Sequence, residues 1–165
     1  MRRKDREVTD INEITDILMR CKTIRIGIQG NEFPYVVPVS FGTTIHNGTV
    51  VIYFHCAKQG EKVDLLLKNP NICIEGDIFD KVEKTQSGIT ARYESVIGFG
   101  TCVLSEDSDE IRNGLEAILN HYGCSDYTLE QCGRSDNLYI GKITLKTITG
   151  KRNLSQASKT ADAFA

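Results

Sequence analysis

Hydrophobic and polar residues alternate along much of the chain, and this spacing predicts a fold built mainly from β-strands. Residues 23–29 alternate strictly, with Ile24, Ile26 and Ile28 on one face and polar or small residues on the other. Five further segments carry the alternating, β-branched or aromatic pattern that is typical of strands. They span residues 33–44, 50–55, 72–78, 91–104 and 138–148. The chain is therefore predicted to form six strands.

Three other segments repeat their apolar residues at helical spacing. The first follows Asp10, a residue type that caps helices, and ends near Cys21. The second spans residues 60–68, and the third runs from the acidic stretch 105–109 to about Tyr122. No helix separates the first three strands, whereas a doubly wound parallel sheet needs one after nearly every strand. We therefore expect an α+β fold, a small antiparallel barrel with helices over its openings.

Two local signals concern the second predicted strand. Asn47-Gly48 is the strongest hairpin signal in the sequence and joins this strand to the next, so the first three strands are expected to form a meander. Pro38 interrupts the strand, because proline cannot donate a hydrogen bond to a sheet. It marks an edge, a bulge or a place where the backbone faces a ligand.

Composition limits the class of protein. The 165 residues carry 20 basic and 22 acidic side chains, and 40% of them are hydrophobic, as in one ordinary globular domain. This charge balance argues against nucleic-acid binding, and no apolar run is long enough to cross a membrane. The charged segment 1–6 is not followed by the apolar segment of a signal peptide. We expect a cytoplasmic protein with one domain over residues 1–152 and a flexible tail over residues 153–165.

The six cysteines are scattered and form no Cys-x-x-Cys pair, so no metal site is expected. In a cytosolic protein such residues are most simply reduced, apolar core residues.

The junction between the third strand and the second helix has the parts of an anion site. Free N–H groups at a helix N-terminus point toward a bound phosphate, and Gly60 lets the backbone come close. Lys62 adds a positive charge in the first helical turn, where the helix dipole disfavours it unless an anion compensates. The alternative is a solvated lysine on an exposed turn.

His55 is predicted to face away from the barrel interior, because Val50, Ile52 and Phe54 occupy the opposite face of its strand. It can serve as a proton carrier or a metal ligand, or it can be an ordinary hydrogen-bonded histidine. No catalytic triad or carboxylate pair follows from residue spacing.

Five stretches of the chain, in order and with similar spacing, match the pattern of one protein group. They are KDREV (4–8), FPYVVPVSFG (33–42), YFH (53–55), GEKVDLL (60–66) and RYESVIGFG (92–100). Together they resemble the Nim group, the nitroimidazole-resistance-related proteins of the pyridoxamine 5′-phosphate oxidase-like, FMN-binding split-barrel superfamily. The likeness extends to about Lys151.

This resemblance implies a six-stranded antiparallel split β-barrel with flanking helices, which forms a homodimer with FMN at the interface. It implies cofactor-binding residues in the second strand, around the end of the third strand, and in the fifth strand of the other subunit. These residues are Val37, Pro38, Val39 and Ser40; His55, Cys56, Ala57 and Lys62; and Ser95.

The expected activity is that of an FMN-dependent oxidoreductase, which passes electrons from a reduced donor to a small acceptor such as a nitro-aromatic compound. His55 is the candidate catalytic residue, as a proton donor or a group that orients the substrate. The second strand opens with Tyr35 and Val36 where pyridoxamine phosphate oxidases proper have a basic residue, so that substrate is not expected. The alternatives are a haem-binding or haem-handling split-barrel protein and a flavin sensor or carrier without turnover.

Overall fold

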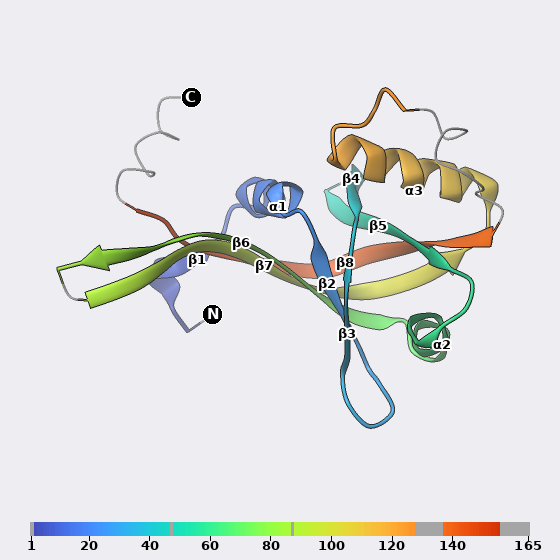
Figure 1. The fold of residues 1–165 in the computed structure, drawn as a ribbon, viewed down its shortest axis with the longest axis horizontal. Helices are drawn as coiled ribbons and strands as arrows, with labels where there is room; N and C mark the ends of the chain where they lie inside the picture. Colours follow the sequence, from blue (N-terminus) through green and yellow to red (C-terminus); the bar gives the residue numbers. More distant parts are fainter. Residues whose placement is uncertain (1, 47, 87, 128–136, 156–165) are drawn as a thin grey trace.

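The computed structural model describes residues 2–46, 48–86, 88–127 and 137–155. This part of the chain forms an antiparallel sheet with three α-helices packed against it (Figure 1). In chain order the elements are η1 (Lys4–Arg6), β1 (Glu7–Val8), α1 (Ile11–Arg20), β2 (Ile24–Ile28), β3 (Tyr35–Val39), β4 (Gly42–His46), β5 (Thr49–Ala57), α2 (Glu61–Lys68), β6 (Asn71–Thr85), β7 (Gly88–Ser105), α3 (Ser108–His121) and β8 (Leu138–Asn153).

The described strands form one sheet with the order β3-β2-β6-β7-β8-β5-β4, and β1 pairs with β8. All six strands expected from the sequence are present, although the second is divided into β3 and β4. The short β1 is an addition. The helices also agree with the prediction, since α1 begins after Asp10, whose carboxylate accepts a hydrogen bond from the Asn12 N–H at 2.7 Å.

The second strand divides because it changes partners. Only Ser40 and Phe41 separate β3 from β4, yet the two lie at opposite edges of the sheet. The three Cα steps that join Val39 to Gly42 span at most about 11 Å, so the sheet must curl until its edges nearly meet. This curled, unclosed sheet is the split barrel of the predicted α+β fold. Both pairings of the expected meander are present, since β3 pairs with β2 and β4 with β5. The three strands do not lie side by side as expected, because β3 and β4 are at opposite edges of the sheet.

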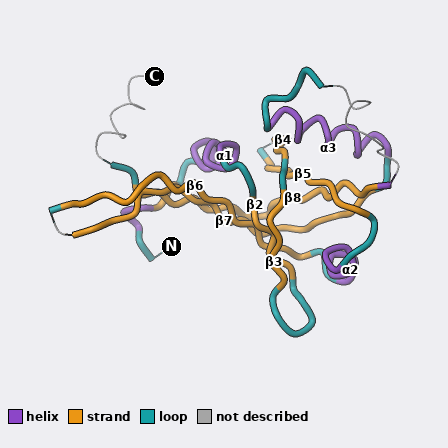
Figure 2. Tube along the Cα trace, in the orientation of Figure 1, coloured by secondary structure: helices purple, strands orange, loops and turns teal. Residues whose placement is uncertain are grey.

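The core lies inside this curled sheet, and a smaller apolar cluster lies outside it. The inner core includes Phe41, Ile52 and Phe54, none of which is exposed to solvent. On the outside, α3 covers Tyr53 and Ile140 and lies beside β4 and β5 (Figure 2). Residues 50–54 of β5 are buried, so a ligand can reach this strand only near its end, where His55 and Ala57 are exposed.

The β6–β7 hairpin extends well beyond the barrel (Figure 1). The polar stretch 81–88, which follows the predicted fourth strand, continues that strand to Thr85. Exposed apolar side chains lie along this extension, among them Phe79, Val82 and Ile89.

In the described part of the chain, no helix is long and apolar enough to cross a membrane. The predicted tail, 153–165, starts at the last residue of β8, and residues 156–165 lie outside the described part. The division into a domain over 1–152 and a tail stays a prediction.

Candidate functional site

Except for Ser95, the predicted site residues lie on or next to the strands that border the split of the barrel, where strand edges lack a neighbouring strand. In the described sheet β3 pairs with β2 alone. On β5, pairing with β4 covers Thr49–Tyr53, and residues 54–57 continue with β8 on one side only. Backbone N–H and C=O groups on these free edges need water or a ligand as partners. Pro38 lies on such an edge, in agreement with its sequence signal.

Ser40 and His55 lie close to this split on its two sides. Gly42 is paired with Tyr53, and the same register extended by two residues would place Ser40 opposite His55. Both residues are exposed, and the His55 ring makes no hydrogen bond within the described residues. The outward orientation predicted for His55 is confirmed. Its imidazole is therefore available to a ligand or a partner molecule.

Residues 58–60 join the end of β5 to the second helix, whose N-terminus has no side-chain cap. Gly60 occupies the N-cap position with φ +125°, a conformation that residues with a side chain rarely adopt. In contrast, α1 and α3 are capped by the carboxylates of Asp10 and Asp107. The first N–H groups of α2 are thus available to an anion.

Lys62 is the cation of this helix terminus. Its Nζ lies 5.4 Å from the centroid of the Phe54 ring, and its side chain is half-buried. Among the described residues, no carboxylate forms an ion pair with it. A positive charge near the positive end of a helix dipole, without an acidic partner, is what a phosphate would compensate.

Two thiols lie near Lys62 on the inner side of the barrel. Burial raises the pKa of Cys56, and it raises that of Cys102 to about 12, while the charge of Lys62 opposes both shifts. Thiols with raised pKa values are poor nucleophiles at neutral pH. These two cysteines therefore act as core residues, as predicted for the cysteines in general.

The structure does not bring all predicted residues to one side of β5. Cys56 is buried with Lys62 nearby, whereas His55 and Ala57 are exposed on the opposite face. On β3, Val39 is buried and Val37 half-buried, and their neighbours Pro38 and Ser40 are exposed.

Ser95 lies away from the split within one chain. It is on β7, two strands from β5 and three from β3 in the sheet order, or roughly 10 and 14 Å at ordinary strand spacing. It is half-buried on the outer face, where it pairs with Asp77 and Lys151. A role for Ser95 at the split therefore needs a second copy of the chain.

Sequence reasoning missed Lys58, which lies between the end of β5 and α2. Its Nζ donates to Glu106 at 3.0 Å and lies 5.8 Å from the centroid of the Tyr139 ring. The acidic partner is 48 positions away along the chain, so no local pattern could reveal the pair. Since Glu106 neutralises Lys58, Lys62 is the stronger candidate for binding an anion.

Comparison with solved structures gives the same fold. A candidate 5-nitroimidazole antibiotic resistance protein from Bacteroides thetaiotaomicron is 27% identical, with 88% of this chain and 85% of that chain covered and a TM-score of 0.77. The flavocytochrome Anf3 from Azotobacter vinelandii is 16% identical, with 98% and 77% covered and a TM-score of 0.73. An FAD- and haem-binding protein from Mycobacterium smegmatis is 15% identical, with 97% and 80% covered and a TM-score of 0.72.

Among curated proteins, no sequence matches the chain significantly. The sequence model of the family described as pyridoxamine 5′-phosphate oxidase matches residues 10–152, which include all the predicted site residues. The family resemblance found in the sequence motifs is thereby confirmed. This protein belongs to the pyridoxamine 5′-phosphate oxidase family.

Proposed function

We propose that the protein is an FMN-binding oxidoreductase that works as a homodimer and reduces a small acceptor, such as a nitro-aromatic compound. The observation that carries this proposal is Lys62, a cation without an acidic partner in the described residues, at an uncapped helix N-terminus beside the split. One lysine and one set of free N–H groups suit a single terminal phosphate, which is what FMN carries.

The edges of the split fit the remainder of the cofactor. A flavin ring is flat and carries several hydrogen-bonding groups, and the free backbone edge of residues 37–40 offers N–H and C=O groups without a neighbouring strand. Pro38 removes one donor from this edge and keeps its backbone stiff. The exposed end of β5 borders the same opening.

The outer face of the sheet supports the proposed dimer. Phe99 and Val36 share this face through the paired row Phe99–Cys73–Gly27–Val36, and their side chains are 55% and 61% exposed. Ile97 lies next to Phe99 on the same face and is also exposed. Apolar surface of this kind marks interaction sites in soluble proteins. A symmetric pair would bury this face and bring the Ser95 of one copy toward the split of the other.

When bound, the flavin supplies the redox chemistry, accepting electrons from a reduced donor and passing them to an acceptor. The chain's own residues hold and orient the reactants. His55 is exposed beside the split, so its imidazole can donate a proton to a reduced acceptor or hydrogen-bond it. The Lys62 ammonium would hold the phosphate end in place.

The absorption spectrum of the purified protein tests this function. We expect flavin bands, or their appearance when FMN is added to a colourless sample. A colourless protein that also fails to bind FMN would overturn the proposal. A Soret band would favour haem binding, and tight FMN binding without oxidation of NADH or NADPH by nitro or quinone acceptors would favour a sensor or carrier.

The variant His55→Ala separates catalysis from binding. If the imidazole acts in proton transfer, as proposed, the variant should keep FMN and lose most turnover. Loss of FMN in this variant would instead make His55 a cofactor-binding residue.

Sedimentation of matched variants tests the dimer. Ile97 and Ile45 are both exposed isoleucines on strands, 44% and 54% respectively, and only Ile97 lies on the proposed interface. Ile97→Arg should give monomers at concentrations where Ile45→Arg remains dimeric. Equal behaviour of the two variants would place the interface elsewhere.

A further inference from the structure

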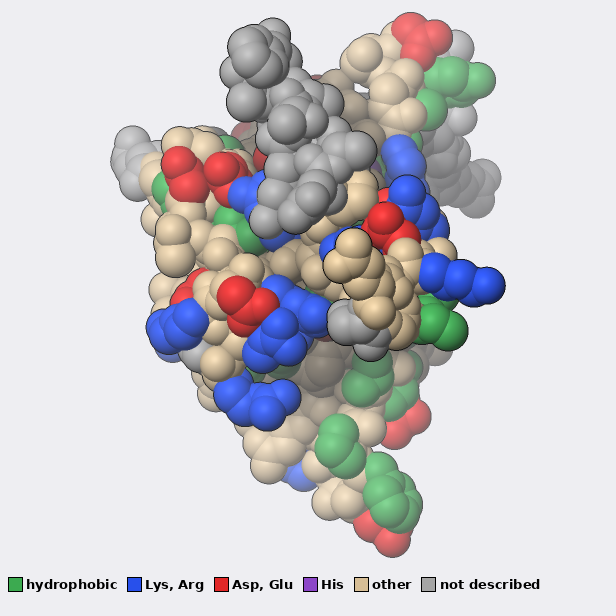
Figure 3. All heavy atoms as spheres, turned by 90° about the vertical axis from the view of Figure 1, so that its left-hand side faces the viewer, with side chains coloured by type: hydrophobic (Ala, Val, Ile, Leu, Met, Phe, Trp, Pro, Cys, Tyr) green, Lys and Arg blue, Asp and Glu red, His purple; other side chains and the backbone are tan. Residues whose placement is uncertain are grey.

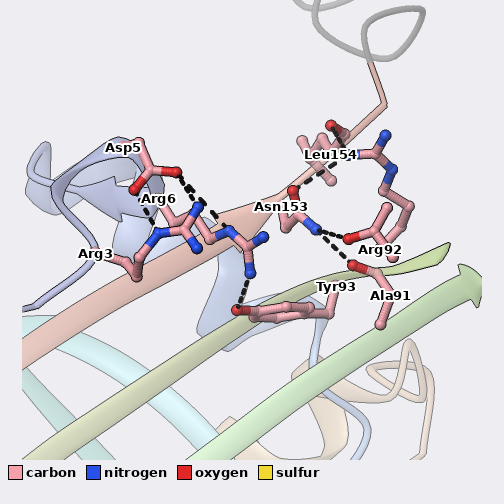
Figure 4. Close-up of polar contacts among 9 residues, drawn as sticks. Arg3, Asp5, Arg6, Ala91, Arg92, Tyr93, Asn153 and Leu154 are labelled. Atoms are coloured by element: carbon pink, nitrogen blue, oxygen red, sulfur yellow. Dashed lines mark hydrogen bonds and ion pairs between the residues drawn. The ribbon is translucent and has the colours of Figure 1, made fainter. Parts of the chain in front are cut away.

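Two cations converge on one tyrosine at the end of the sheet far from α2 and α3. The guanidinium of Arg6 donates a hydrogen bond to the phenol oxygen of Tyr93 at 3.5 Å (Figure 4). The ammonium of Lys151 lies 5.6 Å from the centroid of the same ring. These three residues, from η1, β7 and β8, form what we call the Tyr93 cluster.

The fold holds the three residues together through strand pairing. Glu7 of β1 pairs with Lys151 of β8, so the preceding Arg6 is fixed beside the end of the sheet. Lys151 also pairs with Ser95, and Tyr93 lies two residues from Ser95 on the same strand. Tyr93, Ser95 and Lys151 therefore share the outer face.

The acidic residues of this N-terminal segment already have basic partners. Asp5 lies 2.5 Å from Arg3, in a bidentate contact, and Glu7 lies 3.0 Å from Lys4. Arg6 reaches Asp5 only at 4.0 Å. Figure 3 views the end of the molecule that carries this segment, and basic side chains are prominent there.

Lys151 forms no ion pair within the described residues, and Arg6 forms only the long one with Asp5 at 4.0 Å, so the positive charge of the cluster is only partly neutralised. The phenol responds to this environment. Partial burial alone would raise the pKa of Tyr93, but hydrogen bonds from Lys151 and Arg6, and the charges of both, bring it below its ordinary value. The cluster thus favours negative charge at the position where the two cations meet.

We propose that Arg6, Tyr93 and Lys151 form a binding site for one anionic group, a phosphate or a carboxylate, of a small molecule. Guanidinium and ammonium groups bind both anions by charge-assisted hydrogen bonds, and a phenol O–H adds a third donor. This site is separate from Lys62 and does not depend on flavin binding. Because it adjoins Ser95, it would lie near the flavin in the proposed dimer.

The test uses the protein as purified, labelled with ¹³C at the ζ carbon of its six tyrosines. Comparison with Tyr93→Phe assigns the Tyr93 resonance. Inorganic phosphate and acetate are then titrated separately at constant ionic strength. We expect a saturable shift of the Tyr93 resonance with at least one anion, and a Tyr93 titration midpoint that moves to higher pH when the anion is bound. The two arms distinguish a phosphate site from a carboxylate site.

Matched variants identify the residues responsible. Arg6→Gln and Lys151→Gln should each weaken anion binding by about tenfold, the loss expected for one charge-assisted hydrogen bond. Lys22→Gln, which removes an exposed charge elsewhere, should leave the anion affinity unchanged. A resonance that neither anion shifts, or equal affinities in all variants, would overturn the proposal. FMN affinity measured on the same samples reports on the flavin proposal alone, so the two can fail separately.

Discussion

Replacing Lys62 by glutamine should weaken FMN binding without destabilising the fold. A charge of opposite sign at about 4 Å interacts with the ammonium by about 4 kcal/mol at the effective dielectric constant of a protein surface. Much of this is lost to desolvation, and hydrogen bonds to charged groups contribute about 1.5–3 kcal/mol net. We therefore expect the dissociation constant of FMN to rise roughly 10- to 150-fold.

The stability of the Lys62→Gln variant should change little, because two small terms oppose each other. The variant loses the cation–π contact between Lys62 and Phe54, at 5.4 Å, which contributes about 0.5–1 kcal/mol. It also removes a charge that the helix dipole disfavours by about 0.3–1 kcal/mol. No buried carboxylate loses its partner, since none of the described residues forms an ion pair with Lys62. Urea denaturation should show a difference below about 0.5 kcal/mol.

The assay compares FMN with riboflavin, which has the same ring and no phosphate. Fluorescence titration of both ligands gives the ratio of their dissociation constants, and this ratio isolates the contribution of the phosphate. Lys62→Gln should reduce the preference for FMN by at least about tenfold. Lys68→Gln is the control, since it removes the same charge from the last turn of the same helix, where Lys68 donates to Asn31. Equal weakening of both ligands, or no weakening, would refute the phosphate role of Lys62.

Three further variants test the local physics. Gly60→Ala should lower the free energy of unfolding by about 1–3 kcal/mol in urea denaturation, because φ is +125° although no atom crowds the added Cβ; unchanged stability would contradict this. Burial lowers the pKa of His121, so the side chain takes up a proton on unfolding, and stability should fall as pH drops below about 6.5. Urea midpoints measured at neutral and mildly acidic pH should differ less in His121→Gln than in the unmodified protein. Arg20→Met should lower the free energy of unfolding by about 2 kcal/mol, because Glu94, only 6% exposed, loses its ion-pair partner at 2.7 Å. In thermal unfolding, the double variant Arg20→Met, Glu94→Gln should recover part of this loss.

The strands and helices could be predicted from the sequence, because apolar residues repeat with a different period in each. Which strands pair with one another could not be predicted in this way. Val37, Val39 and Phe41 keep the alternating pattern on both sides of Pro38, so residues 33–44 are predicted to form one strand. Alternation tells which face a side chain occupies and says nothing about which strand lies alongside. The change of partner at Ser40 and Phe41, which opens the split, depends on the closure of the whole sheet.

The hairpin extension escaped prediction for a related reason. Residues 81–88 are mostly polar, as in a loop, yet their backbone groups pair across the β6–β7 hairpin. A two-stranded extension has no core to bury, so its strands need no apolar face. Its existence depends on pairing between Lys81 and Arg92, Val82 and Ala91, and the residues that follow, which no single segment reveals.

The two lysines at the junction of β5 and α2 show which features of the site can be predicted from the sequence and which cannot. Lys58 and Lys62 are four positions apart, and both follow the strand that ends at Ala57. Local sequence identifies Lys62 because the helix start at Gly60 predicts free N–H groups beside it. Only the fold shows that Glu106 neutralises Lys58 while Lys62 lacks such a partner in the described residues. An anion gains most from a charge that no carboxylate already shares, so the pairing state of each lysine, rather than its position in the sequence, makes Lys62 the residue proposed to bind the phosphate.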